Sequence, residues 1–135
     1  ERFAVRNSGA TAIVEGLGDH GCEYMTGGLA IILGSVGYNF AAGMTGGLAF
    51  VYDVDGKSVA HINRGMVNVE ALSAQESSTL QAWLNQHVQL TASEVAQAIL
   101  ADWTAASPRF LKVVPKDLPN QVMPLPTTLA DLVLP

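Results

Sequence analysis

The hexapeptide "MTGGLA" occurs twice in this 135-residue sequence, at 25–30 and again, letter for letter, at 44–49. A weaker copy, "RNSGAT", lies at 6–11, the same distance upstream of the first copy, and keeps its glycine. Self-similarity at a fixed period is typical of repeat architectures. This spacing therefore predicts equivalent units that stack on one another.

The repeat extends to whole columns of residues. Ile13 aligns with Ile32 and Val51, and two glycine columns accompany them: Gly9, Gly28 and Gly47, and Gly18, Gly37 and Gly56. Short second runs follow the strands at 22–24, 40–42 and 59–62, and a fourth unit is expected to begin at "NRGMVNV", 63–69. Each unit is too short for a strand, a crossover helix and two loops, which need about thirty residues. The pattern therefore predicts an all-β fold, a parallel β-solenoid with 19-residue coils over about residues 6–69.

The second strand is apolar on both faces. Leu29, Ile31 and Leu33 alternate with Ala30 and Ile32, and successive side chains of a strand point to opposite faces. A strand that is apolar on both faces is covered on both. We expect one face to fill the solenoid and the other to meet a helix or another domain.

A dinucleotide-binding spacing, G-x-G-x-x-G, is present at Gly16, Gly18 and Gly21. Such a loop must open a helix whose N-terminus receives the pyrophosphate. The stretch that follows Gly21, "CEYMTGG", is too short and too rich in glycine to be a helix. No acidic residue stands about 20 residues further on to hold a ribose. We interpret these glycines as turn residues of the coils, and a nucleotide-binding enzyme remains the weakest alternative.

After Glu70 the pattern becomes helical. "SAQE" at 73–76 and "TASE" at 91–94 are capping boxes, and they predict helices over 74–88 and 93–106. "RFLKVVP" predicts a short strand, and the tail after it is rich in proline. The apolar faces of the two helices are expected to carry Leu80, Trp83, Leu84, Ile99 and Trp103. The predicted organisation is β-helix coils over 1–70, a two-helix cap over 71–107, and an extended segment with a Pro-rich tail over 108–135.

The composition limits the classes of partner. Apolar residues make up 49% of the chain, charged residues only 14%, and the net charge is −5. Nucleic acids and anionic membranes call for Lys/Arg clusters, so neither is expected. Such low charge suggests a chain that buries surface against something else, and the start at Glu1 suggests a fragment or a processed product. The single cysteine and the lack of an 18-residue apolar run fit a cytoplasmic protein.

The residues most suggestive of chemistry lie in "DHGCE", 19–23. A Cys–His pair could be a nucleophile, and His, Cys and carboxylates together could bind a metal. Cys22, however, aligns with Ala41 and Ala60, a column of small residues, which indicates a buried, inert thiol. The other candidates are interpreted as turn, surface or hydrogen-bonded residues: Asp19, His20, Glu23, Asp53, Asp55, His61 and His87. No catalytic, cofactor-binding or metal-ligating residue is therefore predicted.

Three stretches resemble a known family: "NSGATAIVEGLGDHGCEYMTGG", "GYNFAAGMTGGLAFVYD" and "LADW…SPRFLKVVPKD". From about Arg6 to Asp117 the chain is similar to the C-terminal GXGXG domain of the glutamate synthase large subunit. The Gly-rich coils alone would also suit the related repeat found in one subunit of formylmethanofuran dehydrogenase. A free-standing β-helix interaction subunit of a redox complex is therefore the second hypothesis.

The resemblance implies a right-handed parallel β-helix that serves as a non-catalytic scaffold. It implies a parent enzyme that makes two L-glutamate from L-glutamine and 2-oxoglutarate with reducing equivalents. FMN and an iron–sulfur cluster belong to other domains of that parent, so no cofactor is expected in this chain. The implied partners are the flavin-binding and amidotransferase domains of the same parent chain, and the electron donor, NADPH or ferredoxin, stays open.

The first coil lacks an earlier coil with which to pair. An unpaired strand edge recruits other chains, and residues 1–5 are too few to cover it. We therefore expect the isolated chain to self-associate through this coil, near Thr11 and Ile13.

Overall fold

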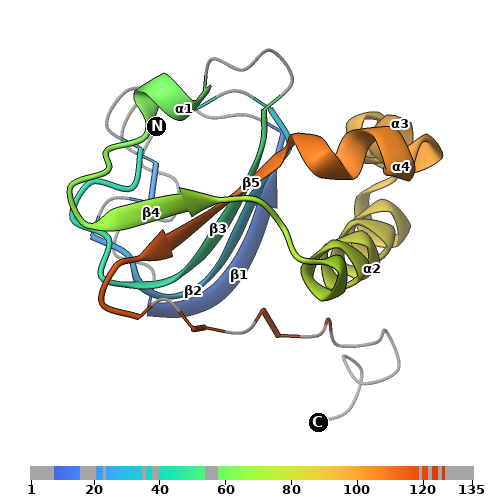
Figure 1. Ribbon diagram of the computed structural model, residues 1–135. Coiled ribbons are helices and arrows are strands. Elements are labelled where there is room, and N and C mark those ends of the chain that lie inside the picture. Colours follow the sequence, from blue (N-terminus) through green and yellow to red (C-terminus); the bar gives the residue numbers. More distant parts are fainter. Residues whose placement is uncertain are drawn as a thin grey trace, which may run out of the picture.

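The computed structural model describes residues 8–15, 21–22, 24–34, 36–37, 40–53, 58–118, 120–121, 123–124 and 126. One five-stranded sheet runs through this part of the chain, in the order β1-β2-β3-β5-β4 (Figure 1). Its strands are β1 (Ser8–Val14), β2 (Thr26–Ile32), β3 (Gly46–Tyr52), β4 (Val67–Glu70) and β5 (Phe110–Pro115). The helices are α1 (Ser58–His61), α2 (Ala74–Thr91), α3 (Glu94–Ala101) and α4 (Trp103–Ala106), and a 3₁₀ turn, Ser107–Arg109, leads into β5.

The predicted all-β right-handed parallel β-helix is wrong. The described part of the chain is a mixed α/β domain, in which β1, β2 and β3 are parallel but β5 is antiparallel to both β3 and β4. β4, expected to begin a fourth coil on top of β3, is separated from β3 by β5. The third short run, 59–62, lies mostly within helix α1. The parallel stack stops at β3 because a strand from outside the repeat occupies that edge.

The register shows how far the repeat describes the structure. Between β2 and β3 the offset predicted by the two MTGGLA copies holds, since Ile31 pairs with Phe50 and Ile32 with Val51. Between β1 and β2 an irregularity shortens the offset by one, so Ile13 pairs with Ile31 and not with Ile32. The shift keeps Ile13 on the same side of the sheet as Ile31 and Phe50, with which it packs.

In the second copy of "MTGGLA", both adjacent glycines stand where an added Cβ would collide with the neighbouring strand. A Cβ on Gly46 would collide with the backbone carbonyl of Thr26 on the neighbouring strand. Gly47 has a φ of +79°, and its Cβ would stand 2.8 Å from the carbonyl group of Gly27. Gly28, the equivalent of Gly47 one repeat earlier, also has a positive φ, 87°. Residues that carry a side chain rarely adopt a positive φ. Glycine at these positions therefore allows the irregular starts of β2 and β3 to lie close together.

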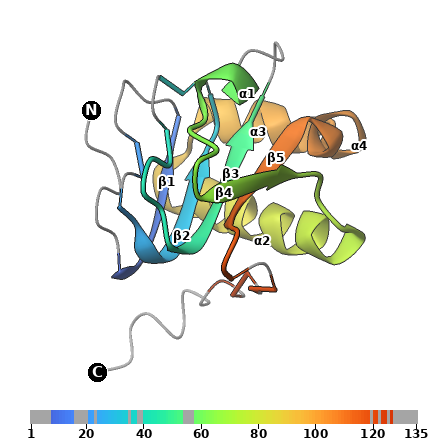
Figure 2. The same ribbon diagram turned by 60° about the vertical axis from the view of Figure 1, so that its left-hand side comes forward.

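Both faces of β2 and β3 are largely buried, as the alternation of apolar residues in the second strand predicted. The helices α2, α3 and α4 lie along one face (Figures 1 and 2). There Leu29, Ile31 and Phe50 share a core with Leu80 and Leu84. The residues of the other face pack against the connecting segments in a second core: Ala30, Ile32, Ala49, Val51 and Val113 with Cys22, Met25, Phe40, Met44 and Ile62.

Of the two predicted capping boxes, one forms and the other does not. Ser73 and Glu76 form the predicted capping box, and α2 runs from Ala74 to Thr91, beyond the expected end at residue 88. The predicted box at 91–94 is wrong, because the N-cap of α3 is Ser93, whose hydroxyl accepts from the Ala96 N–H. α2 continues through Thr91, and its C-cap residue Ala92 is left-handed with a φ of 55°.

Replacing Gly47 with alanine should destabilise the fold by about 2 kcal/mol or more, because it adds a Cβ at positive φ against a backbone carbonyl. Gly65→Ala is the matched control: the nearest group to its added Cβ is the Asn63 side chain, at 3.2 Å. Urea unfolding followed by tryptophan fluorescence measures both. Equal stability of Gly47→Ala and Gly65→Ala would contradict this account of the paired glycines.

Candidate functional site

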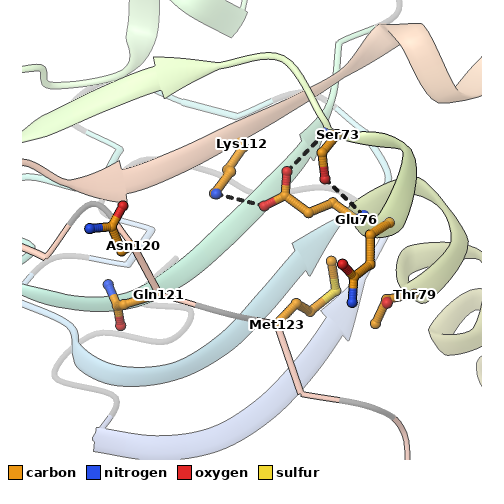
Figure 3. A pocket seen from close by; sticks show the side chains of 8 residues that line it. Ser73, Glu76, Thr79, Lys112, Asn120, Gln121 and Met123 are labelled. Carbon is orange, nitrogen blue, oxygen red and sulfur yellow. Dashed lines mark hydrogen bonds and ion pairs between the residues drawn. The ribbon is translucent and has the colours of Figure 1, made fainter.

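A hollow with a largely polar lining lies between β5, the start of α2 and the segment after β5 (Figure 3). Its volume is about 320 Å³. The lining is mostly polar, with one methionine: Ser73, Gln75, Glu76, Thr79, Lys112, Asn120, Gln121 and Met123. We refer to this hollow as the α2–β5 cleft and take it as the candidate site.

The charged centre of the α2–β5 cleft is an ion pair. Lys112 lies on β5 between Phe110 and Val114, both of which belong to the core under the helices. The residue is only 8% exposed, and its Nζ lies 2.6 Å from a carboxylate oxygen of Glu76. A lysine in such a position needs a partner, since burial of an unpaired charge is costly. The pair therefore ties the first turn of α2 to the sheet.

Glu76 has two further bonds to Ser73. Its other carboxylate oxygen accepts from the Ser73 N–H at 2.9 Å, and the Ser73 hydroxyl accepts from the Glu76 N–H at 3.1 Å. Partial burial opposes ionisation of the carboxyl, but the hydrogen bonds from Lys112 and Ser73 and the Lys112 charge together lower the pKa of Glu76 below its ordinary value. Glu76 is thus held as a carboxylate by groups of the fold itself.

The segment after β5 crosses the sheet and reaches α2. The Gln121 side chain accepts from the Gly47 N–H and donates to the Gly47 carbonyl, both at 3.0 Å. By the β3–β5 register, which pairs Ala49 with Val113, Gly47 would face Pro115, which lacks an N–H. The carboxamide of Gln121 therefore supplies to the Gly47 carbonyl the donor that Pro115 lacks.

The same segment has two more attachments. Met123 is 5% exposed and belongs to the core under the helices. The indole N–H of Trp83 donates to the Pro124 carbonyl at 2.7 Å. The proline-rich tail thus docks on this domain through its described residues.

The chemistry open to the α2–β5 cleft is limited by this bonding. Its two charged side chains neutralise one another, so the Lys112 ammonium is engaged and is not aimed at a phosphate or a substrate carboxylate. An iron–sulfur cluster requires several cysteine thiolates, whereas this chain has one cysteine. The residues of this chain therefore do not fit such a cluster.

The structure confirms that Cys22 is buried, with no exposed surface. Burial raises the pKa of its thiol to about 12, so the thiolate that a nucleophile or a metal ligand needs is scarcely populated. Several other candidates fall outside the described residues: Gly16, Gly18, Asp19, His20, Glu23 and Asp55. Within the described residues there is no group of three or more His, Cys, Asp or Glu side chains that could hold a metal.

Two of the three histidines weighed in the sequence lie among the described residues, and they differ in environment. His61 was expected to be on the surface or hydrogen-bonded, and its Nδ1 lies 2.7 Å from the Val36 carbonyl. The same expectation is wrong for His87, whose Nε2 is buried and has no hydrogen-bond partner. His87 comes three and four residues after Leu84 and Trp83, on the side of α2 that faces the sheet.

Sequence reasoning missed Lys112 and Gln121 as members of a site. The signal for Lys112 was available, because it interrupts the apolar alternation of "RFLKVVP" on the side that Phe110 and Val114 share. Gln121 carries no local signal, because its role comes from Pro115 and Gly47, residues that the fold brings together.

Glu76→Gln should lower the free energy of unfolding by about 1–3 kcal/mol at pH 7, since it leaves Lys112 without its counter-charge. The folded-state pKa of Glu76 is lowered, so its stabilisation is present above the unfolded value, about 4.3, and is lost as pH falls through the folded value. Urea unfolding between pH 7 and pH 3 checks this. The difference between the native chain and Glu76→Gln should shrink toward pH 3.

Glu94→Gln is the control for that series, since Glu94 is an exposed acidic residue in the first turn of α3. It should change stability by less than about 0.5 kcal/mol. A Glu76→Gln effect that is equal at pH 7 and pH 3 would show that the ion pair is not its cause.

No helix in the part of the chain that the structure describes is long and apolar enough to cross a membrane.

Comparison with known proteins identifies the family. The model of the GXGXG motif family matches residues 1–116. Glutamate synthase [NADH] of Schizosaccharomyces pombe is 52% identical over 118 residues, which are 87% of this chain and 6% of the relative. The glutamate synthase [NADPH] large chain of Bacillus subtilis is 48% identical over 119 residues, 87% of this chain and 8% of the relative.

Ferredoxin-dependent glutamate synthase of Spinacia oleracea is 48% identical over 116 residues, 85% of this chain and 7% of the relative. The chain thus spans less than a tenth of the length of these curated relatives. The chain belongs to the GXGXG family and corresponds to the GXGXG domain of glutamate synthase large chains.

Proposed function

We propose that this domain is a non-catalytic scaffold of a glutamate synthase. The parent enzyme makes two L-glutamate from L-glutamine and 2-oxoglutarate with reducing equivalents. The domain's part is to hold neighbouring catalytic domains in a fixed geometry. This proposal rests on the family and on the character of the candidate site.

The observation that carries the proposal is the bonding inside the α2–β5 cleft. Lys112 and Glu76 are bonded to each other, and Glu76 is also bonded to Ser73. A general acid or base must reach a substrate proton with a group that is free to exchange it. These side chains instead fasten a helix to a sheet, which favours a structural role for the α2–β5 cleft.

The pattern of identities supports a role that does not depend on the electron donor. Relatives named for NADH, NADPH and ferredoxin are 52%, 48% and 48% identical to this chain. A surface that recognised one donor would be expected to favour the relatives that use it. We therefore assign donor recognition to other parts of the parent.

We further propose that FMN and the iron–sulfur cluster of the parent are bound by other domains. The flavin-binding and amidotransferase domains of the same chain are then the partners of this domain. The cytoplasm is the proposed location, since the single cysteine is a buried thiol and is not part of a disulfide.

The double substitution Lys112→Met and Glu76→Gln in the full parent enzyme tests the proposal. It removes both charges of the α2–β5 cleft and keeps similar side-chain volumes. The rate of glutamate formation should stay within about threefold of the native rate, because no reacting group is lost, whereas removal of a general acid or base costs about 100-fold or more.

Gly47→Ala is the companion variant, since it disturbs the strand packing and leaves the cleft charges in place. For a scaffold, it should lower the ratio of glutamate formed to glutamine consumed. A 100-fold loss of rate in the double variant, with an unchanged melting temperature, would refute the non-catalytic assignment.

A further inference from the structure

The segment after β5 lies across the surface between the start of β3 and α2, a region that we call the groove. We call the described residues 120, 121, 123 and 124 the strap. The strap has three attachments, made by Gln121 on Gly47, by Met123 in the core under the helices, and by Pro124 on the Trp83 indole. Figure 3 shows Gln121 and Met123 on this segment, close to the strands and to α2.

Surface hollows lie beside the strap. The α2–β5 cleft lies on one side of it, and a hollow of about 330 Å³ lies on another, lined by Thr11, Gly28, Leu29, Gly47, Leu48, Gln121 and Pro124. A third hollow, also about 330 Å³, is lined by Asp117, Leu118, Asn120 and Gln121. The described residues of the strap are thus attached to the domain at separate points, with surface hollows beside them.

The groove offers a specific set of partners to whatever lies in it. Gly47 presents an N–H and a carbonyl to one side chain, and a carboxamide satisfies both because it carries a donor and an acceptor. A carboxylate could only accept. The indole N–H of Trp83 requires an acceptor, which the backbone carbonyl of Pro124 provides three residues after Gln121. Between these points the core admits an apolar side chain, that of Met123.

We propose that this groove is a docking site for an extended polypeptide segment and that the strap is its intramolecular occupant. The segment it fits presents a glutamine carboxamide to Gly47, a methionine-sized apolar side chain two residues later, and a backbone carbonyl to Trp83 one residue after that. Main-chain groups of an irregular strand start give the affinity, and the apolar site gives the specificity, as in other modes of peptide capture. The inference stands apart from the proposed scaffold role.

A labelled peptide with the sequence of residues 117–126, DLPNQVMPLP, is the probe. It is titrated into the full native chain and into the full chain carrying Gln121→Leu and Met123→Ala, which weakens the strap and leaves the groove unchanged. The peptide should bind the variant saturably and the native chain roughly tenfold or more weakly, because a tethered occupant competes at an effective concentration in the millimolar range. Fluorescence anisotropy measures both.

The two tryptophans provide a site-specific readout by NMR, since the indole N–H of Trp83 bonds to Pro124 and that of Trp103 bonds to Ser77. In the double variant the Trp83 signal should move away from its native position and return as peptide is added. The Trp103 signal should stay in place throughout, which also shows that the variant is folded. If the double variant fails to fold, Gln121→Leu alone serves in its place.

Two matched controls decide whether the peptide binds in the groove. Trp83→Phe in the variant background keeps an aromatic ring but removes the indole N–H, and it should weaken peptide binding about tenfold. A peptide with leucine in place of its glutamine should bind more weakly by a similar factor. Absence of saturable binding up to millimolar peptide, or equal binding of both peptides, would overturn the proposal.

Discussion

The antiparallel pairing of β5 with β3 is the interaction on which the rest of this structure depends. The first three strands repeat and could continue to stack in parallel, but β5 occupies the free edge of β3 and reverses the direction. In doing so it separates β4 from the parallel strands. A repeating stack is thereby converted into a bounded, mixed sheet with a helical layer on one face.

The polar links of the domain follow from the register of that pairing. Val113 faces Ala49, which places Phe110, Lys112 and Val114 toward the helices, and so Lys112 meets Glu76 in the first turn of α2. Continued by two residues, the same register would set Pro115 opposite Gly47, whose N–H and carbonyl both bond to Gln121. The helical layer is therefore held to the sheet by apolar packing together with an ion pair at one point and the strap at another.

Local patterns in the sequence predicted the parts of the fold that local physics determines. The MTGGLA repeat predicted the parallel pairing of β2 and β3 and its register, and the capping box at Ser73 predicted the start of α2. The fold class was not predictable from the repeat, because β5 has no counterpart in the repeat and pairs with β3, a strand far upstream in the sequence. Likewise, Cys22 was assigned correctly from its column of small residues, whereas Gln121 acquires its role only through contact with Gly47.

The most direct test of this account is the distance between the Hα protons of Phe50 and Lys112, measured by NMR. The Asp53 N–H donates to the Arg109 carbonyl at 2.9 Å, so the alternation of an antiparallel ladder makes Phe50 and Lys112 a non-hydrogen-bonded pair. The Cα atoms of such a pair approach to about 4.5 Å and bring their Hα protons together. The account predicts a strong Hα–Hα cross-peak between Phe50 and Lys112. Its absence, with β3 showing cross-peaks to a parallel strand at that edge, would contradict the mixed sheet.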